Sequence, residues 1–325
     1  MRLSVVVPCY NEQQGVGELH RRVSAACAAT VGESYEIVLI NDGSRDATWP
    51  AMLAQAAQDA HLVCINLSRN HGHQLALTAG LQFCRGERIF ILDADLQDPP
   101  ELLPEMMRRM DGGCDVVYGQ RVKRTGESWF KQLAALVFYR ILNRLVDIEI
   151  PVDTGDFRLM SRRALETLNG MPEHHRFIRG MVSWIGLRQE PLRYERAPRF
   201  AGETKYPLAK MLRLAFDAIT SFSVRPLRVA SYLGIAVGFF ALLMLVYVFV
   251  RWIHGNTVEG WASVMAALLV IGSGQLFVAG VMGEYLGRLY IESKHRPLFV
   301  IQDVVRNGSP PSTVVQPTVG SDNEG

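Results

Sequence analysis

The stretch RIFILDADLQDPPE, residues 88–101, contains the pattern that decides the fold. Its apolar run, Ile89–Leu92, has the length of a buried strand and ends at two carboxylates, Asp93 and Asp95. Comparable runs followed by polar residues occur at Leu3–Val7, Glu36–Ile40, Leu62–Leu67 and Val116–Tyr118. Such runs, alternating with helical patterns, are typical of βαβ units. The sequence therefore predicts an α/β fold with a mostly parallel, Rossmann-like sheet.

Helical patterns fill the intervals between these runs, at Gly17–Ala29, Ala47–Ala57, Gln74–Phe83 and Glu101–Met110. Polar motifs follow four of the predicted strands: PCYNE at residues 8–12, NDGS at 41–44, SRN at 68–70 and DAD at 93–95. In open α/β sheets, ligands bind beyond the carboxyl ends of the strands. We therefore expect a binding site at that edge of the sheet.

The carboxylates Asp93 and Asp95 indicate a cation site, with Gln97 two residues further on. Oxygen ligands suit a hard cation such as Mg²⁺ or Mn²⁺, which proteins share with substrate phosphates. A DxD sequence is also common in solvated turns, and its position at a strand end favours the cation. His71 and His73 form an alternative metal pair without a third ligand, so we interpret residues 70–74 as a loop that caps the next helix.

Several enzyme and partner classes lack support in this chain. It contains no GxGxxG, GxxxxGK[ST] or GxSxG motif, which argues against a dinucleotide oxidoreductase, a P-loop enzyme and a serine hydrolase. A net charge of +2 argues against a nucleic-acid partner. The five cysteines are scattered without a CxxC pair, so we expect reduced thiols in a domain that faces the cytosol.

Basic residues gather in two further segments, QRVKR at 120–124 and RFAGETKY at 199–206, and a polar turn, DTGDFR, occupies 153–158. Cations beside a carboxylate metal site suit a phosphate-rich ligand, because they offset charge that the metal alone does not neutralise. The alternative is attraction of a basic surface to lipid headgroups.

Two uncharged segments, Val229–Val250 and Ala262–Gly283, are each 22 residues long. That length crosses a hydrocarbon core of about 30 Å. Basic residues flank the pair on its outer sides, which predicts that the N-terminal domain and the C-terminus are both in the cytosol. We expect the two segments to lie in the inner (plasma) membrane. The alternative is a buried helical hairpin in a soluble protein. Glycines in the second segment favour close helix packing between subunits, so we expect a homo-oligomer.

Residues 128–146 carry polar and apolar faces at helical spacing, with Trp129 and Phe130 on the apolar face. This pattern favours an amphipathic helix at the membrane interface, with an ordinary core-facing helix as the alternative. The composition after Asn307 predicts a disordered tail. The expected domains are residues 1–225, a cytosolic catalytic domain; 226–306, a membrane domain with a cytosolic return; and 307–325, the tail.

The motifs PCYNE, NDGS, SRNHGHQLALTAG, DADLQDPPE and RFAGETK resemble, in this order, the polyisoprenyl-phosphate glycosyltransferases of glycosyltransferase family 2. The resemblance runs from about Leu3 to Arg296 and is nearest to the bactoprenol glucosyltransferase branch; dolichol-phosphate mannose synthases belong to the same group. It implies a GT-A fold, a nucleotide-sugar donor, a polyprenyl-phosphate acceptor in the lipid bilayer, and inversion at the sugar carbon.

The resemblance also implies roles for particular residues. The nucleotide-binding residues would be Pro8, Tyr10, Glu12, Asp42 and Asp93, and the metal ligands would be Asp95, Gln97 and Asp93. The remaining catalytic residues would be Arg121, Arg199 and Lys205 on phosphates, and Asp156 at the reaction centre. Two departures from the family pattern are Asn41, where many members have Asp, and Thr204, where Ser is usual.

We therefore predict a metal-dependent enzyme that transfers one hexose, with glucose from UDP-glucose expected, to undecaprenyl phosphate for cell-envelope glycan modification. The lipid phosphate would attack the anomeric carbon directly. Mannose or formamido-arabinose is the alternative sugar. A processive polysaccharide synthase would carry more membrane helices and a QxxRW motif, which the chain lacks. A non-catalytic membrane scaffold that binds a nucleotide is the remaining alternative.

Overall fold

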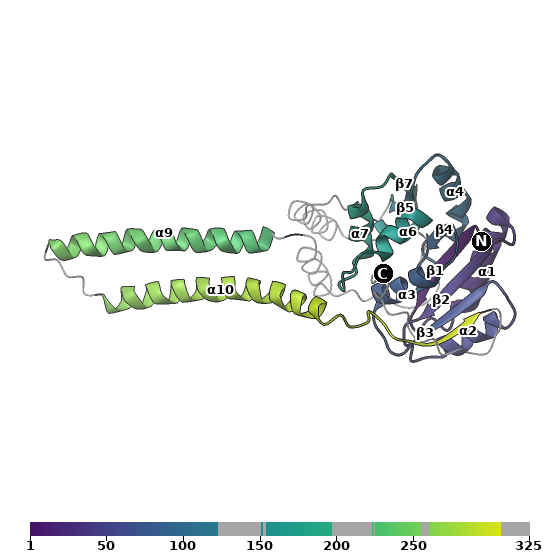
Figure 1. The fold of residues 1–325 in the computed structure, drawn as a ribbon, viewed down its shortest axis with the longest axis horizontal. Helices are drawn as coiled ribbons and strands as arrows, with labels where there is room; N and C mark the ends of the chain where they lie inside the picture. Colours follow the sequence, from purple (N-terminus) through teal and green to yellow (C-terminus); the bar gives the residue numbers. More distant parts are fainter. Residues whose placement is uncertain (123–150, 152–153, 197–222, 224, 255–259, 307–325) are drawn as a thin grey trace, which may run out of the picture. The chain divides into compact units, whose positions relative to one another are not determined.

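A computed structural model of the chain describes residues 1–122, 151, 154–196, 223, 225–254 and 260–306 (Figure 1). The predicted amphipathic helix at 128–146, the predicted tail at 307–325, and Arg199, Thr204 and Lys205 lie outside the described residues. The chain divides into two compact units. The first contains the sheet, and the second contains two long helices.

Eight strands of the described residues form one mixed sheet in the order β7-β5-β6-β4-β1-β2-β3-β8. Strands β4, β1, β2 and β3 are parallel, β5 is parallel to β7, and β6 and β8 pair antiparallel to their neighbours. Their bounds are β1 Leu3–Cys9, β2 Tyr35–Asn41, β3 Leu62–Leu67, β4 Arg88–Ile91, β5 Val116–Arg121, β6 Thr154–Ser161, β7 Gln189–Tyr194 and β8 Ile301–Arg306.

Helices cover both faces of the sheet because the central strands are apolar on both sides, as parallel strands in α/β folds are. Val5 and Val7 of β1 share a core cluster with Leu19 and Val23 of α1. On the other face, a Cβ at Gly80 of α3 would lie 2.4 Å from Val6 Cγ1, so only glycine allows this approach. The helical bounds are α1 Val16–Val31, α2 Thr48–Ala56, α3 His73–Phe83, the short 3₁₀ helix η1 Pro100–Leu102, α4 Leu103–Asp111, α6 Arg162–Asn169 and α7 Ile178–Ile185.

After the second long helix the chain adds β8 to the free edge of β3. The Val300 carbonyl accepts a hydrogen bond of 2.9 Å from Ser68 N–H, and Arg306 donates to the Phe83 carbonyl at 3.0 Å. The predicted membrane domain, 226–306, included these residues, whereas the structure places Ile301–Arg306 in the sheet. Strand β8 escaped sequence reasoning because its partner strand lies more than two hundred residues earlier in the chain.

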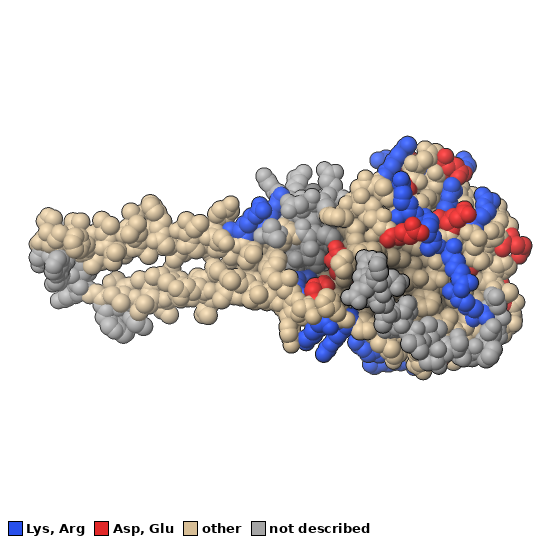
Figure 2. Space-filling model, viewed as in Figure 1, with Lys and Arg blue, Asp and Glu red and all other residues tan. Residues whose placement is uncertain are grey.

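The second unit contains α9, Arg225–Ile253, and α10, Trp261–Ser293, which pack against each other as a hairpin (Figure 1). The segments Arg225–Arg251 and Ala267–Ser293 are each 27 residues long, which is enough to cross a bilayer, and their most apolar 18-residue stretches have mean hydropathies of 2.7 and 1.5. Figure 2 shows the described surface of both helices without charged side chains along most of its length. The second apolar segment extends ten residues beyond the predicted end at Gly283, because the isolated charges Glu284, Arg288 and Glu292 do not interrupt the helix.

Candidate functional site

The site lies at the carboxyl edge of the parallel strands, where the chain leaves β1, β2 and β4 and enters the antiparallel strand β6. Asp93 and Asp95 follow β4, and Asp156 stands near the start of β6. The sheet therefore brings together carboxylates that are about sixty residues apart in the sequence. Strand order alone accounts for this meeting, because β6 pairs directly with β4.

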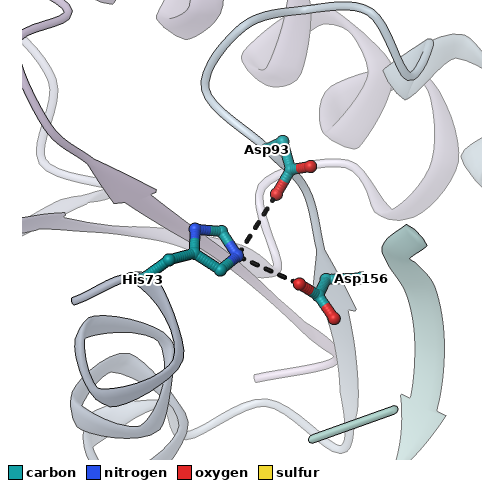
Figure 3. A group of neighbouring side chains, drawn as sticks. All are labelled: His73, Asp93 and Asp156. Carbon is teal, nitrogen blue, oxygen red and sulfur yellow. Dashed lines mark hydrogen bonds and ion pairs between the residues drawn. The ribbon is translucent and has the colours of Figure 1, made fainter. Parts of the chain in front are cut away.

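Asp156 is fully buried and accepts hydrogen bonds from three side chains, which with it form the Asp156 cluster. Arg179 of α7 donates from Nε to Oδ1 at 2.9 Å and from Nη2 to Oδ2 at 3.2 Å. Gln74 Nε2 donates to Oδ2 at 3.0 Å, and His73 Nε2 lies 3.0 Å from the same oxygen (Figure 3). Both oxygens of this carboxylate are thus already occupied.

Charges within the cluster fix its protonation. Burial alone would raise the pKa of Asp156, but the charges of Arg179 and His73 outweigh it and hold the pKa well below its usual range. Burial would likewise lower the pKa of His73, yet the hydrogen bond and charge of Asp156 raise it. Asp156 is consequently ionised near neutral pH, and the arrangement favours a protonated His73.

Asp93 approaches the same ring nitrogen of His73 as Asp156 does, with its Oδ1 3.6 Å from His73 Nε2 (Figure 3). Burial raises the pKa of Asp93 to about 6, and the negative charges of Asp156, Asp98 and Asp95 act in the same direction against His73. Its Oδ1 is buried and has no hydrogen-bond partner among the described residues. Such an oxygen is costly to bury alone, so Asp93 is suited to meet a cation.

The oxygens of Asp93, Asp95 and Gln97 fit a hard divalent cation. A left-handed turn at Leu96, with φ of 54°, lets Asp95 Oδ1 accept from the Gln97 N–H at 3.2 Å. His73, Asp93 and Asp156 form a second group whose ligand atoms lie within 4.8 Å of one another. That group fits a cation less well, because Arg179 and Gln74 already occupy Asp156.

A second buried carboxylate, Asp98, lies beside two arginines and a tyrosine. We call Asp98, Arg121, Tyr194 and Arg196 the Asp98 cluster. The Tyr194 hydroxyl donates to Asp98 Oδ1 at 2.5 Å, and Arg196 Nε lies 3.3 Å from the same oxygen. Arg121 Nη2 lies 3.6 Å from Oδ2. Burial raises the pKa of Tyr194, and the Asp98 charge raises it further, so the phenol stays protonated and remains a donor.

The Asp98 cluster adjoins the predicted cation ligands. Arg196 Nη2 lies 3.7 Å from Asp95 Oδ2, so one guanidinium faces both carboxylates. Gly155, the residue before Asp156, leaves room for Arg121: a Cβ there would lie 2.7 Å from Arg121 Nη2. Carboxylates and cations therefore alternate across the edge of the sheet.

Besides Asp93, the residues predicted to contact the nucleotide lie near the end of β1 or in the loops after β1 and β2. Tyr10 is exposed, whereas Pro8 is buried within β1 beside Ile40. Glu12 donates its backbone N–H to Thr48 Oγ1 at 2.8 Å. The Asp42 oxygens accept from the backbone N–H groups of His71 and Gly72 at 2.7 and 3.0 Å. Burial raises the pKa of Asp42 despite these bonds.

The structure thus brings Asp93, Asp95, Gln97, Arg121 and Asp156 to one edge of the sheet. Sequence reasoning missed five partners in the two clusters: Gln74, Asp98, Arg179, Tyr194 and Arg196. Asp98 stood within the quoted DADLQD stretch, so its motif was a usable signal. Arg179, Tyr194 and Arg196 belong to no motif, and only the packing of α7 and β7 reveals them.

Family models match most of the chain. The model of glycosyl transferase family 2 matches residues 4–168, and that of the GtrB C-terminal hairpin matches residues 225–289. The chain is 44% identical over 303 residues to the uncharacterized glycosyltransferase YkcC of Bacillus subtilis (strain 168), which covers 93% of this chain and 94% of the relative. It is 38% identical over 304 residues to the bactoprenol glucosyl transferase of Shigella phage SfV, with 93% and 99% covered.

Solved structures resemble the chain less closely. Residues 1–349 of S. aureus TarS in complex with UDP-GlcNAc have a TM-score of 0.46 and 18% identity, over 68% of this chain and 66% of that chain. The family assignment therefore rests on the family models and the sequence relatives.

Proposed function

The chain belongs to glycosyltransferase family 2, and we propose that it transfers a single glucose from UDP-glucose to undecaprenyl phosphate with inversion at the anomeric carbon. Relatives named bactoprenol glucosyl transferases, which align over more than nine-tenths of the chain, support glucose and a polyprenyl lipid as its substrates. The observation that carries the proposal is the position of Arg196, which faces both Asp95 and Asp98, together with Arg121 beside Asp98.

The acceptor supplies its own nucleophile. A phosphate monoester has a second pKa near 6, so at pH 7 most of it is a dianion with no proton to lose. One of its oxygens would form the new bond to the anomeric carbon while the bond from that carbon to the diphosphate breaks. The electron pair of that bond leaves with UDP, so charges balance without a general base.

Asp156 has a positioning role in this proposal. Its two oxygens accept from Arg179, Gln74 and His73, and its low pKa leaves it a poor base near neutral pH. The buried anion instead holds the cationic His73 beside Asp93, at the edge where the diphosphate would lie. This arrangement orients a positive charge without taking up a proton.

The leaving group carries the charge that the site must stabilise. Asp93, Asp95 and Gln97 would hold Mg²⁺ or Mn²⁺, which would supply positive charge to the diphosphate. Arg121 and Arg196 would bind phosphate oxygens of the donor or acceptor, held by Asp98 until those anions arrive. Arg199 and Lys205, which lie outside the described residues, are proposed to add further phosphate contacts.

We also propose that α9 and α10 cross the inner membrane, with the sheet unit and both termini in the cytosol. Their length and hydropathy and the basic residues at their outer ends support this orientation. The amphipathic segment at 128–146 would lie at the membrane surface, and the small residues of α10 would pack between subunits of a homo-oligomer.

A transfer assay tests the proposal. The purified full chain receives undecaprenyl phosphate and, in parallel, UDP-glucose, a GDP-mannose sample and a UDP-formamido-arabinose sample, each radiolabelled in the sugar. We expect an organic-soluble labelled lipid from UDP-glucose alone. A labelled lipid formed from another donor would show that the transferred sugar is not glucose. UDP binding without any labelled lipid would identify a scaffold instead of an enzyme.

A further inference from the structure

Three side chains connect the C-terminal strand β8 to the end of β2. Asn66 of β3 donates from Nδ2 to Asp303 Oδ2 of β8 at 3.0 Å. Asn41, the last residue of β2, donates from Nδ2 to Asn66 Oδ1 at 2.8 Å. Asn41 and Asn66 are buried, with 3% and 8% of their surfaces exposed. We call Asp303, Asn66 and Asn41 the amide relay.

The relay has a fixed direction. The Asp303 carboxylate accepts hydrogen bonds and donates none, so it orients the Asn66 amide with its NH₂ group toward β8. The Asn66 carbonyl oxygen then faces residue 41, which must present a donor to it. An asparagine meets this need, whereas an ionised aspartate would place two acceptors opposite each other in a buried position.

The relay ends in the loops proposed to bind the nucleotide. Asn41 Oδ1 accepts from the Ser44 N–H at 3.2 Å, and Ser44 Oγ accepts from the Asn11 N–H at 3.0 Å. Gly43, between Asn41 and Ser44, restricts the backbone of this loop: its φ is +60°, and a Cβ there would lie 2.4 Å from the Arg69 carbonyl carbon. The loops after β1 and β2 are thus tied to the side chain of Asn41.

Strand β8 is held on the sheet by several contacts, so the position of Asp303 is fixed. Besides its ladder with β3, Arg306 Nη1 lies 3.5 Å from Glu36 Oε2 of β2, and His71 Nε2 accepts from the Val300 N–H at 3.4 Å. His71 also donates its backbone N–H to Asp42. The segment that begins at Val300 and continues into β8 therefore contacts the same loops twice, through Asp303 and through His71.

We propose that Asp303 is a positioning residue for nucleotide binding, acting through Asn66 to determine that residue 41 is a donor and to fix the loop at residues 41–44. The strand that follows the long helices would then be part of the nucleotide site. This inference rests on the proposed function for the identity of the ligand, whereas the direction of the relay rests on the hydrogen bonds alone.

Exchanging the two ends of the relay tests this direction. In Asn41→Asp, the Asn66 side chain faces a carboxylate at each end. Its NH₂ group donates to only one of them, and its carbonyl oxygen then faces the other carboxylate without a hydrogen bond. In the double variant Asn41→Asp/Asp303→Asn, the amide turns over, donates to the new carboxylate at 41 and accepts from the new amide at 303. Net charge is the same as in the original chain. Asp303→Asn alone replaces an acceptor-only group with an amide that can present either a donor or an acceptor, so it no longer imposes the direction of the relay. The exposed Gln302→Ala on the same strand is the control.

Each full-length variant is measured in detergent for UDP affinity by calorimetry and for its thermal midpoint. For Asn41→Asp we expect UDP affinity to fall by about tenfold and the midpoint to fall by roughly 2–6 °C, from one unpaired buried group. The double variant should regain most of both losses, Asp303→Asn alone should show a smaller decrease in both, and only Gln302→Ala should stay close to the original chain. This rescue is not expected if residue 41 matters only for its size.

Two outcomes would overturn the inference: unchanged UDP affinity in a folded Asn41→Asp chain, or a double variant no better than the single one. If the original chain binds no UDP, the nucleotide part of the proposed function fails. The thermal midpoints of the four variants then still decide whether the relay has the proposed direction.

Discussion

Arg179 Nε and Nη2 lie 2.9 and 3.2 Å from the two oxygens of Asp156, a bidentate pair that links α7 to β6 inside the site. Asp156 has no exposed surface, while 29% of the Arg179 side chain is exposed. Bidentate pairs between arginine and a carboxylate combine charge with a fixed geometry. This pair therefore sets both the ionisation of Asp156 and the place of α7 against the sheet.

The pair predicts how activity depends on pH. Because the pKa of Asp156 is lowered, this group is ionised throughout pH 5–8, and its contribution to stability is lost only as pH falls through the lowered pKa. We expect the acid limb of kcat/KM to be the same in the original chain and in Asp156→Asn, following the phosphate acceptor instead. An acid limb that disappears in Asp156→Asn would identify Asp156 as a base.

Replacing Arg179 with Met should destabilise the sheet unit, since it leaves Asp156 buried without its main counter-charge. Breaking a buried pair costs about 3 kcal/mol or more, and the matched control is Arg188→Met, whose partner Glu190 is at the surface. Thermal unfolding of the full chain checks this, with a much larger decrease expected for Arg179→Met. Equal decreases would show that the Asp156 cluster contributes little.

Asp95→Asn should reduce turnover by a factor on the order of 10²–10³, because it removes a negative ligand of the cation that stabilises the leaving diphosphate. It should also weaken Mn²⁺ binding, measured by electron paramagnetic resonance without substrate. Asp111→Asn, at an exposed pair with Arg88, is the control. Normal turnover of the original chain in excess chelator would contradict the metal assignment.

Asp98→Asn should lower kcat on the order of 10–100-fold without raising the donor KM. The substitution loosens Arg121 and Arg196 but leaves their positive charge, so binding of an anion is maintained while its placement is lost. Tyr194→Phe removes one hydrogen bond of the same cluster and should have a smaller effect. An increase in KM at constant kcat would indicate that Asp98 contributes only to binding.

A reporter fused after Gly325 should be cytosolic, and one inserted at Asn256, between the two long helices, should be external. The expectation follows from the two apolar segments and the basic residues at their outer ends. Protease digestion of intact cells that carry a cleavable tag at either site measures on which side of the membrane each tag lies. The opposite location of either tag would contradict the proposed topology.

The sequence predicted the first half of the sheet because β1 to β4 are buried on both faces and read as continuous apolar runs. Strand β6 escaped this reasoning, since it carries Asp156 and Arg158 among its buried residues and so lacks an apolar pattern. Strand β7 contains Pro191 and lies at the edge of the sheet, where proline is tolerated. The resemblance to family 2, with its GT-A fold, is confirmed.

For the site, the motif at residues 93–97 was sufficient to locate Asp93 and Asp95. No motif indicated the partners of the buried carboxylates. Burial of Asp156 and Asp98 creates the need for Arg179, Arg196 and Tyr194, and burial is a property of the folded chain. The departure at Asn41 has a similar explanation: its amide donates to Asn66, whose orientation Asp303 sets from a strand that sequence reasoning did not foresee.

The most direct test of direct attack by the lipid phosphate is the anomeric configuration of the product. The full chain is incubated with UDP-glucose, whose glucose is α-linked, and undecaprenyl phosphate, and the glycolipid is analysed by nuclear magnetic resonance. The account predicts a single β-linked glucosyl phosphate and stoichiometric UDP. An α-linked product would contradict a single displacement by the lipid phosphate, and so would free glucose as the main product.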